Sequence, residues 1–423
     1  MALFLFPVLY FGQNSVPVAG RCFVYQGGMA AIKGKENRIM LQPYQDSYAT
    51  HFNSLADMMT YHVKQAADSQ WERTEVKSLC AEPLDESSPL YRDNDLSAFN
   101  SLVSEDAVKD TAKNLGLAIS MNGTRYPVRD TAYKSLLDRA KVSGTALLKL
   151  PRSSLARILN DCLATQKNAA TLLLIRDQKI SAVHSGDEKD YSILPIGELM
   201  GSIKTKLDER FPGNTFDSGY SDHSLTSAAW SLPDQKDELL GSYHKTLAAQ
   251  GKAAVAAKLI PGIRFSTSDT GVASAKVSAL LLGLRYPIHI GGMVSTEHRG
   301  QANVGDFQAR LDMLFAQFED SVARLEKLTT VILDHPVNAM AAICKNLRMP
   351  KKTALEAIAM FEMAYGGGTA TAHDVFMAMQ EIMFMLKTEK TPEGKMLFLE
   401  ESMARALTLN WSKYDYAKAV GWQ

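Results

Sequence analysis

The sequence predicts an α+β fold, with antiparallel strands and flanking helices in the body of the chain and a helical region at its C-terminal end. Two apolar runs, residues 171–176 and 180–184, are separated by three polar residues, as in a β-hairpin. Further short runs alternate with stretches whose apolar residues recur at helical spacing. From Val304 onward the spacing is helical, which predicts the C-terminal helical region.

The first hundred or so residues look loosely structured, and the element signals become stronger after Gly123. A helix is predicted over residues 53–67, and the polar, proline-bearing residues 82–95 are typical of a linker. Asp130 can cap a helix that runs to Lys141, and Pro151 suits the first turn of a second helix. The apolar stripe of that second helix contains Leu155, Ile158, Leu159, Cys162 and Leu163.

The remaining elements follow in order along the chain. Extended segments are expected at residues 215–220, 224–232, 263–267 and 285–294, and helices at residues 196–211, 236–259 and 307–328. Four shorter C-terminal helices are expected to start at Pro336, Pro350, Thr371 and Pro392. We therefore divide the chain into an N-terminal region (1–95), an α+β core (96–300) and a C-terminal helical region (301–423).

The charge balance limits the classes of function. Lysine and arginine total 46, as do aspartate and glutamate, so the formal net charge is zero. A basic excess is common in nucleic-acid-binding proteins, but a groove needs only a local basic stripe. The four cysteines are far apart and form no CxxC pair, which argues against disulfides and a zinc site. We expect no metal and no cofactor.

The N-terminal residues 1–11 are almost wholly apolar. They are too few to span a bilayer, and the basic start and small-residue cleavage site of a signal peptide are missing. The stretch is a packed strand, a signal, or translated sequence upstream of a true start at Met29 or Met40. Because no other run is long enough to span a membrane, we expect a cytoplasmic protein without a membrane partner.

Basic residues recur near the predicted hairpin and its neighbouring helices. If they converge, they form a groove that contacts the phosphates of single-stranded nucleic acid, with Tyr126 and Tyr133 stacking on bases. The alternative is a solvated surface of mixed charge, since four aspartates are interleaved with the basic residues. The predicted phosphate contacts are Arg125, Arg129, Arg152, Arg176, Lys179 and Arg299.

Three short motifs carry residues with catalytic or anion-binding chemistry. The triplet at residues 269–271 (DTG) resembles that of aspartic proteases, although a turn explains it equally well. Residues 222–224 (DHS) combine three catalytic residue types, but neighbours in sequence do not form a triad. Residues 297–300 (EHRG) precede a predicted helix and are either an anion site or a solvated turn. We therefore assign no catalytic residue.

Several segments together resemble a known family. They read RYPVRDTAYKSLLDRAKVSGTALLKL, LARILNDCLATQKNAATLLLIRDQKISAVHSGDEKDYSILPIGELMGSI, PGIRFSTSDTGVASAKV and HRGQANVGDFQARLDMLFAQFE. In this order they are similar to the phage/plasmid-like protein family, the domain of unknown function 932, over roughly residues 123–330. The resemblance implies a gene of a mobile element, a cytosolic setting and a nucleic-acid role. It implies no catalytic residues.

These observations leave three hypotheses. The first is a phage- or plasmid-type accessory protein that binds single-stranded nucleic acid without catalysis. The second is a structural or assembly protein that forms a homo-oligomer through its long helix and the Met-rich C-terminal helices. The third is an enzyme of unrecognised type, in which His298 or Asp269 meets a second titratable group in a concave site.

Overall fold

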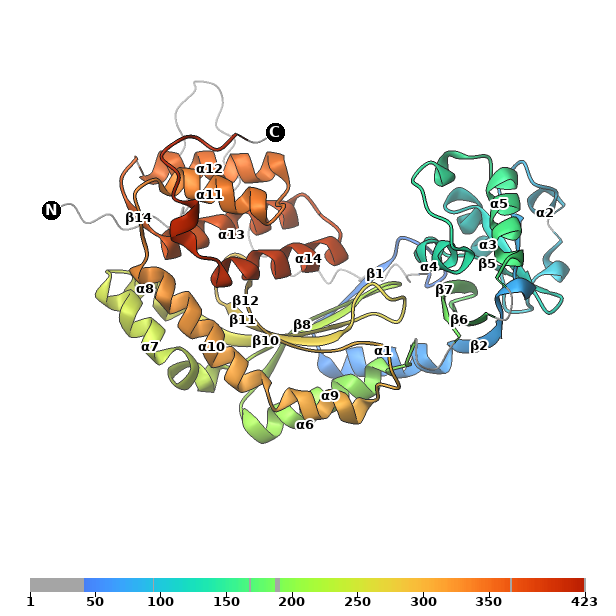
Figure 1. Cartoon of the computed structure of the whole chain (residues 1–423). Helices are drawn as coiled ribbons and strands as arrows, with labels where there is room; N and C mark the ends of the chain where they lie inside the picture. The colour runs from blue at the N-terminus through green and yellow to red at the C-terminus, as the bar shows by residue number, and fades with distance from the viewer. Residues whose placement is uncertain (1–41, 94, 167–168, 187–190, 366, 422–423) are drawn as a thin grey trace, which may run out of the picture. The chain divides into compact units, whose positions relative to one another are not determined.

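A six-stranded antiparallel sheet forms the centre of the larger part of the structure (Figure 1). The computed structural model describes residues 42–93, 95–166, 169–186, 191–365 and 367–421; the apolar residues 1–11, Met29 and Met40 lie outside these ranges. The strand order is β1-β8-β9-β10-β11-β12. The strands are β1 (Ala49–Phe52), β8 (Thr215–Asp222), β9 (Thr226–Ser231), β10 (Ile260–Thr267), β11 (Ala275–Leu282) and β12 (Ile288–Thr296).

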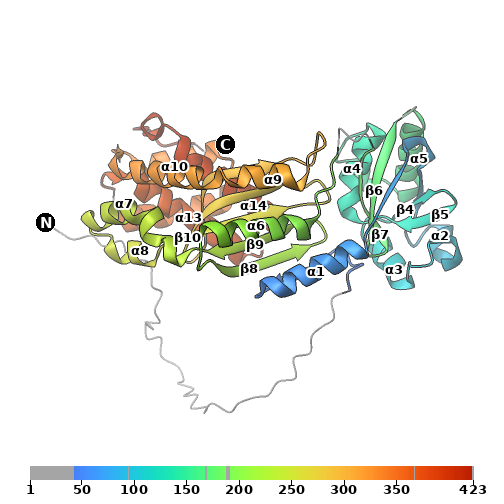
Figure 2. The same ribbon diagram turned by 90° about the horizontal axis from the view of Figure 1, so that it is seen from below.

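Helices cover both faces of this sheet. The helices on one face are α6 (Ile196–Arg210), α7 (Lys236–Ala249), α9 (Val304–Leu311) and α10 (Leu314–Lys327), which Figure 2 shows in front of the strands. Helix α14 (Glu393–Ala404) lies against β12 on the other face. Nearly every residue of β10 and β11 is buried because both faces are covered, as expected for central strands of a layered α+β fold. The predicted fold class is thus confirmed.

Two predicted helices are interrupted. The residues predicted as one helix over 307–328 form α9 and α10, separated at Asp312 and Met313. The predicted helix over 236–259 divides into α7 and α8 (Ala253–Lys258), and Gly251 at the break has a φ of +76°. The helical spacing of apolar residues continues in the sequence through both breaks. One turn of altered backbone still leaves the following apolar residues on the side of the helix that faces the core.

Two three-stranded sheets form the smaller part of the structure, with orders β2-β6-β7 and β3-β4-β5. Their strands are β2 (Gln70–Glu75), β3 (Cys80–Pro83), β4 (Leu117–Met121), β5 (Thr124–Pro127), β6 (Ala170–Arg176) and β7 (Lys179–Ser185). The helices between them are α2 (Pro89–Arg92), α3 (Glu105–Lys113), α4 (Asp130–Ala140) and α5 (Arg152–Ala164). The predicted linker over 82–95 thus contains part of β3 and all of α2.

The predicted β-hairpin is confirmed as β6 and β7. Its turn has two residues instead of the expected three, since Lys179 already pairs with Arg176. Asp177 and Gln178 have φ values of +51° and +73°, the left-handed conformation that a tight two-residue hairpin turn needs at both central positions. The turn therefore forms without the glycine that usually marks it.

The predicted C-terminal helices are present, each beginning at or directly after its expected residue. They are α11 (Pro336–Asn346), α12 (Lys351–Tyr365), α13 (Ala372–Thr388) and α14. Thr371 caps α13 in a reciprocal pair of hydrogen bonds with Asp374. Helix α1 (Leu55–Ala67) also agrees with its prediction. A short pair of strands, β13 (Ile332–Leu333) and β14 (Ala370–Thr371), accompanies these helices.

The segment after α14 packs back onto α11. Trp411 is buried, and its indole N–H donates to the carbonyl of Ala406 at 2.8 Å. The carboxylate of Asp415 accepts from the backbone N–H groups of Asp334 and His335, at 2.9 and 2.7 Å, directly before α11 begins. This carboxylate therefore satisfies donors that a helix start leaves without partners.

Gly283 in the turn between β11 and β12 gives a stability prediction. Its φ is +94°, and a Cβ there would overlap the carbonyl oxygen of Lys258. Gly283→Ala is therefore expected to lower the free energy of unfolding by about 2 kcal/mol or more, measured by urea denaturation. Gly201→Ala in α6 is the control, since that Cβ meets nothing within 4 Å. An equal decrease in the free energy of unfolding for both variants would contradict the claim that the backbone at Gly283 excludes a Cβ.

Candidate nucleic-acid interface

The hairpin formed by α4 and α5 presents one apolar and one polar side. Helix α4 ends where Lys141 adopts a left-handed conformation with a φ of +55°, and α5 begins after Pro151. Leu136 of α4 and Leu159 of α5 are fully buried in a core shared with β6 and β7. The outward faces of both helices and most of the segment between them are exposed. We refer to α4, α5 and the residues between them (130–164) as the basic hairpin.

The basic hairpin has an excess of positive charge. It contains six cationic side chains and three carboxylates, those of Asp130, Asp138 and Asp161. No carboxylate of the described residues lies within 4 Å of any of these cations. The cationic residues are Lys134, Arg139, Lys141, Lys149, Arg152 and Arg157. Because they are not neutralised locally, they are available to a polyanion.

Three of the six predicted phosphate contacts have exposed or half-buried side chains. Arg152 belongs to the basic hairpin, and its guanidinium donates to the carbonyls of Leu148 and Leu150 at 3.1 and 3.4 Å. Arg125 is half-buried and pairs with Glu82 at 2.9 Å. The side chain of Arg299 is 76% exposed and lies 4.0 Å from the Glu297 carboxylate. Of these three, only Arg152 belongs to the basic hairpin, and the other two each lie within 4 Å of a glutamate.

Arg129 and Lys179, two further predicted contacts, lie in the interior. The fully buried ammonium of Lys179 donates to Asp46 at 2.8 Å and to Asp110 at 2.5 Å. Arg129 is also fully buried and donates to the backbone carbonyls of Pro43 and Gln45 at 3.0 and 2.7 Å. Phosphate contact would require these buried bonds to break, at high cost. Both residues are better explained as structural cations.

Arg176, the sixth predicted contact, is buried as well. Its guanidinium donates to the Asp269 carboxylate at 2.6 Å and to the Ser69 hydroxyl at 2.8 Å. The DTG triplet therefore places its carboxylate against an arginine, not against a second carboxyl as in an aspartic protease. Arg176 links the β6–β7 hairpin to the end of β10, and phosphate contact by its guanidinium would break this link.

A cluster of four rings, which the sequence did not reveal, lies beside Asp269. The rings of His184 and Tyr191 stack with centroids 3.7 Å apart, the ring of His298 stacks on Tyr191 at 5.4 Å, and Trp71 flanks both His184 and Tyr191 at 6.0 and 5.8 Å. The Asp269 carbonyl accepts from the Tyr191 hydroxyl at 3.0 Å and lies 2.8 Å from Nε2 of His184. Burial lowers the pKa of His184 to about 4, so this imidazole is neutral at pH 7.

The other two motifs form structural turns. The Asp222 carboxylate accepts from the backbone N–H groups of Ser224 and Leu225, both at 2.7 Å, which is an Asx turn. His298 is buried, with Nδ1 3.2 Å from the carbonyl of Ser192. At the start of α9, the side chains of Asn303 and Asp306 each accept a hydrogen bond from the backbone N–H of the other residue. These contacts favour the turn interpretation of both motifs over a catalytic or anion-binding one.

The predicted stacking tyrosines are also poorly placed for bases. Tyr126 is buried, and its hydroxyl accepts from the Asn100 amide at 3.2 Å. Tyr133 is half-buried, and its hydroxyl forms no hydrogen bond with the described residues. Neither ring presents an open face of the kind that base stacking requires.

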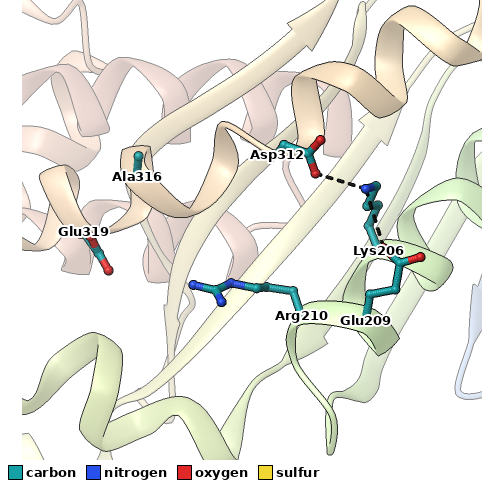
Figure 3. A pocket seen from close by; sticks show the side chains of 6 residues that line it. All are labelled: Lys206, Glu209, Arg210, Asp312, Ala316 and Glu319. Carbon is teal, nitrogen blue, oxygen red and sulfur yellow. Dashed lines mark ion pairs between the residues drawn. The ribbon is translucent and has the colours of Figure 1, made fainter.

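A surface hollow of about 520 Å³ lies between α6 and the α9–α10 break. Figure 3 shows Lys206, Glu209 and Arg210 of α6 facing Asp312, Ala316 and Glu319. Lys206 pairs with Asp312 at 3.1 Å and with Glu209 at 3.5 Å. Because three carboxylates face two cations, the hollow is unsuited to an anionic ligand.

Comparison of the chain with protein-family models, curated protein sequences and solved structures gives no match. None of the helices in the described part of the chain combines the length and apolar character that a bilayer crossing requires. In the same ranges, no three or more His, Cys, Asp or Glu side chains gather as metal ligands do. The basic hairpin is therefore the feature from which a function is best argued.

Proposed function

We propose that the protein binds nucleic acid through the basic hairpin, as an accessory protein of the phage or plasmid type and without catalysis. The observation that carries this proposal is the excess of six cations over three carboxylates within residues 130–164, with none of the six cations held in an ion pair with the described residues. A polyanion gains free energy there by releasing condensed counterions, and no internal ion pair has to break first. The resemblance to a phage- and plasmid-borne family points to the same class.

The shape of the hairpin favours contact with the phosphate backbone. Its linking residues 141–151 are mostly exposed and include Ser143 and Gly144, so a backbone can approach closely. Leu148 is a 45% exposed apolar side chain in the same segment and can contact a base face. Single-stranded nucleic acid leaves base faces open to such contact, whereas a duplex hides them. We therefore propose single strands as the preferred ligand.

The test is fluorescence anisotropy with labelled oligo-dT over a salt series. With five or six phosphates contacted, the logarithm of the association constant should fall against the logarithm of salt with a slope of about −4. The triple variant Lys134→Gln, Lys141→Gln, Lys149→Gln is expected to reduce the steepness of that slope by about 2. Competition with a duplex of equal length tests the strand preference.

A matched triple variant controls for the loss of charge alone. Lys245, Lys327 and Lys395 are exposed lysines on other helices and form no ion pair with the described residues. Changing these three to glutamine should leave the salt slope unchanged. Absence of binding at low salt, or equal effects of the two triple variants, would overturn the proposal.

A further inference from the structure

One face of the sheet β2-β6-β7 carries an aromatic and a basic side chain at its β2 edge. Leu173, on the opposite face, belongs to the core that β6 shares with α4 and α5. Because side chains alternate along a strand, its neighbour Leu172 points away from that core. Leu172 pairs with Arg73 of β2 and with His184 of β7. Trp71, two residues before Arg73, therefore lies on the same face.

This face is buried at its centre and accessible at its β2 edge. Leu172 and His184 are buried, whereas Trp71 is half-buried and Arg73 is exposed on an outer strand of the sheet. The Arg73 guanidinium donates to the carbonyl of Gly186, and no carboxylate of the described residues lies within 4 Å of it. The edge therefore presents an indole beside a cation that no described carboxylate neutralises.

The two rings next to Trp71 support the indole without covering its faces. Its ring centroid lies 6.0 Å from that of His184 and 5.8 Å from that of Tyr191, while those two stacked rings are 3.7 Å apart. Because Trp71 is almost equally far from both members of the pair, it lies beside the pair and not on top of it. The indole plane is only 27° and 33° from theirs, so these rings meet its edge.

We propose that Trp71 is a stacking platform for one base of a bound single strand, with Arg73 as the neighbouring phosphate contact; this rests on the nucleic-acid binding proposed above. An indole face accepts any base, because every base has a π-face. Two residues of a strand span about 6.5 Å, so the guanidinium can reach a phosphate beside the stacked base. The platform supplies the ring contact that Tyr126 and Tyr133 are not placed to make.

An abasic strand separates stacking from phosphate contact, because it carries the phosphates of oligo-dT but no bases. In fluorescence anisotropy at equal salt, the full chain is expected to bind oligo-dT of about 16 nucleotides about tenfold more tightly than an abasic strand of equal length. Trp71→Leu should remove most of this difference and leave both the abasic affinity and the salt slope unchanged. Trp71→Phe keeps an aromatic face and should retain most of the difference.

Tyr91→Leu is the matched control, since it removes another half-buried ring, on α2 of the same part of the structure, and should not change the preference for oligo-dT. Arg73→Gln should weaken binding of both strands and reduce the steepness of the salt slope by about 1.

Three results would overturn the platform and leave binding by the basic hairpin intact. They are equal affinities of the full chain for oligo-dT and the abasic strand, equal effects of Trp71→Leu and Tyr91→Leu, and an equal loss of affinity for both strands in Trp71→Leu. Absence of binding to either strand at low salt would overturn the nucleic-acid function itself.

Discussion

Lys179→Met is expected to lower the free energy of unfolding by about 3–5 kcal/mol. The ammonium group is fully buried between the carboxylates of Asp46 and Asp110, at 2.8 and 2.5 Å. Methionine fills a similar volume but leaves two negative charges without their shared cation. Asp46 is itself nearly fully buried, so water cannot replace the lost partner. The cost comes from the uncompensated charge and not from lost packing.

Urea denaturation at pH 7 measures this loss. Lys204→Met is the control, because Lys204 pairs with Asp208 on the exposed side of α6 and such pairs contribute at most about 1 kcal/mol. The double variant Lys179→Met, Asp110→Asn should recover part of the stability, since Asp46 then keeps the buried guanidinium of Arg129 as its cation at 3.8 Å. A loss for Lys179→Met no larger than that for Lys204→Met would contradict the structural role assigned to Lys179.

Acidification from pH 6.5 to pH 4 is expected to remove most of the stability of the protein. Burial lowers the pKa values of His62, His184 and His289 to about 4, from an ordinary value of 6.5. Each shift corresponds to about 3 kcal/mol. A domain is stable by about 5–15 kcal/mol in total, so three such groups have a large effect.

The direction in which stability changes with pH follows from proton binding by these histidines. In the unfolded chain these imidazoles bind protons below pH 6.5, whereas in the folded chain they stay neutral down to about pH 4. Their contribution is fully present above pH 6.5 and is lost as the pH falls to about 4. Burial raises the carboxyl pKa values of Asp130 and Asp177, and these two groups oppose the trend. The pKa shifts of the three histidines are expected to have a larger effect on stability than those of the two aspartates.

Urea denaturation at several pH values between 4 and 8 gives the slope of the free energy of unfolding against pH. His289→Gln should reduce the number of protons taken up on unfolding by about one, because His289 is buried on β12, the strand that α14 covers. His51→Gln, at an exposed position of β1, controls for removal of an imidazole in general. Constant stability from pH 8 to pH 4 would contradict the assignment of neutral buried histidines.

Elements with a local signal were predictable from the sequence. The β6–β7 hairpin follows from two apolar runs and an intervening polar stretch, and the starts of the C-terminal helices follow from proline or a capping threonine. The break between α9 and α10 was missed because the apolar spacing continues across Asp312 and Met313. The fold class depends on many such signals together, so one error does not change it.

The candidate site was only partly predictable, because charge pairing depends on contacts between distant residues. Arg176 and its partner Asp269 are 93 positions apart, and Lys179 and Asp46 are 133 apart. One local signal was available: β6 contains four consecutive apolar residues, so both of its faces are apolar, which indicates a buried strand, and Arg176 is its last residue. Arg152 lies instead on an amphipathic helix with an exposed face, where a cation remains accessible.

The contacts of Asp415 have a consequence for how the helical bundle is completed. Asp415, which follows α14 in the sequence, accepts from backbone N–H groups at the start of α11. The C-terminal segment therefore caps a helix that begins more than 70 positions before it. A chain shortened before Trp411 would lose both the Asp415 cap and the buried indole of Trp411. A synthetic peptide of this sequence, added to the shortened chain, should then bind at the vacated place and restore its melting temperature.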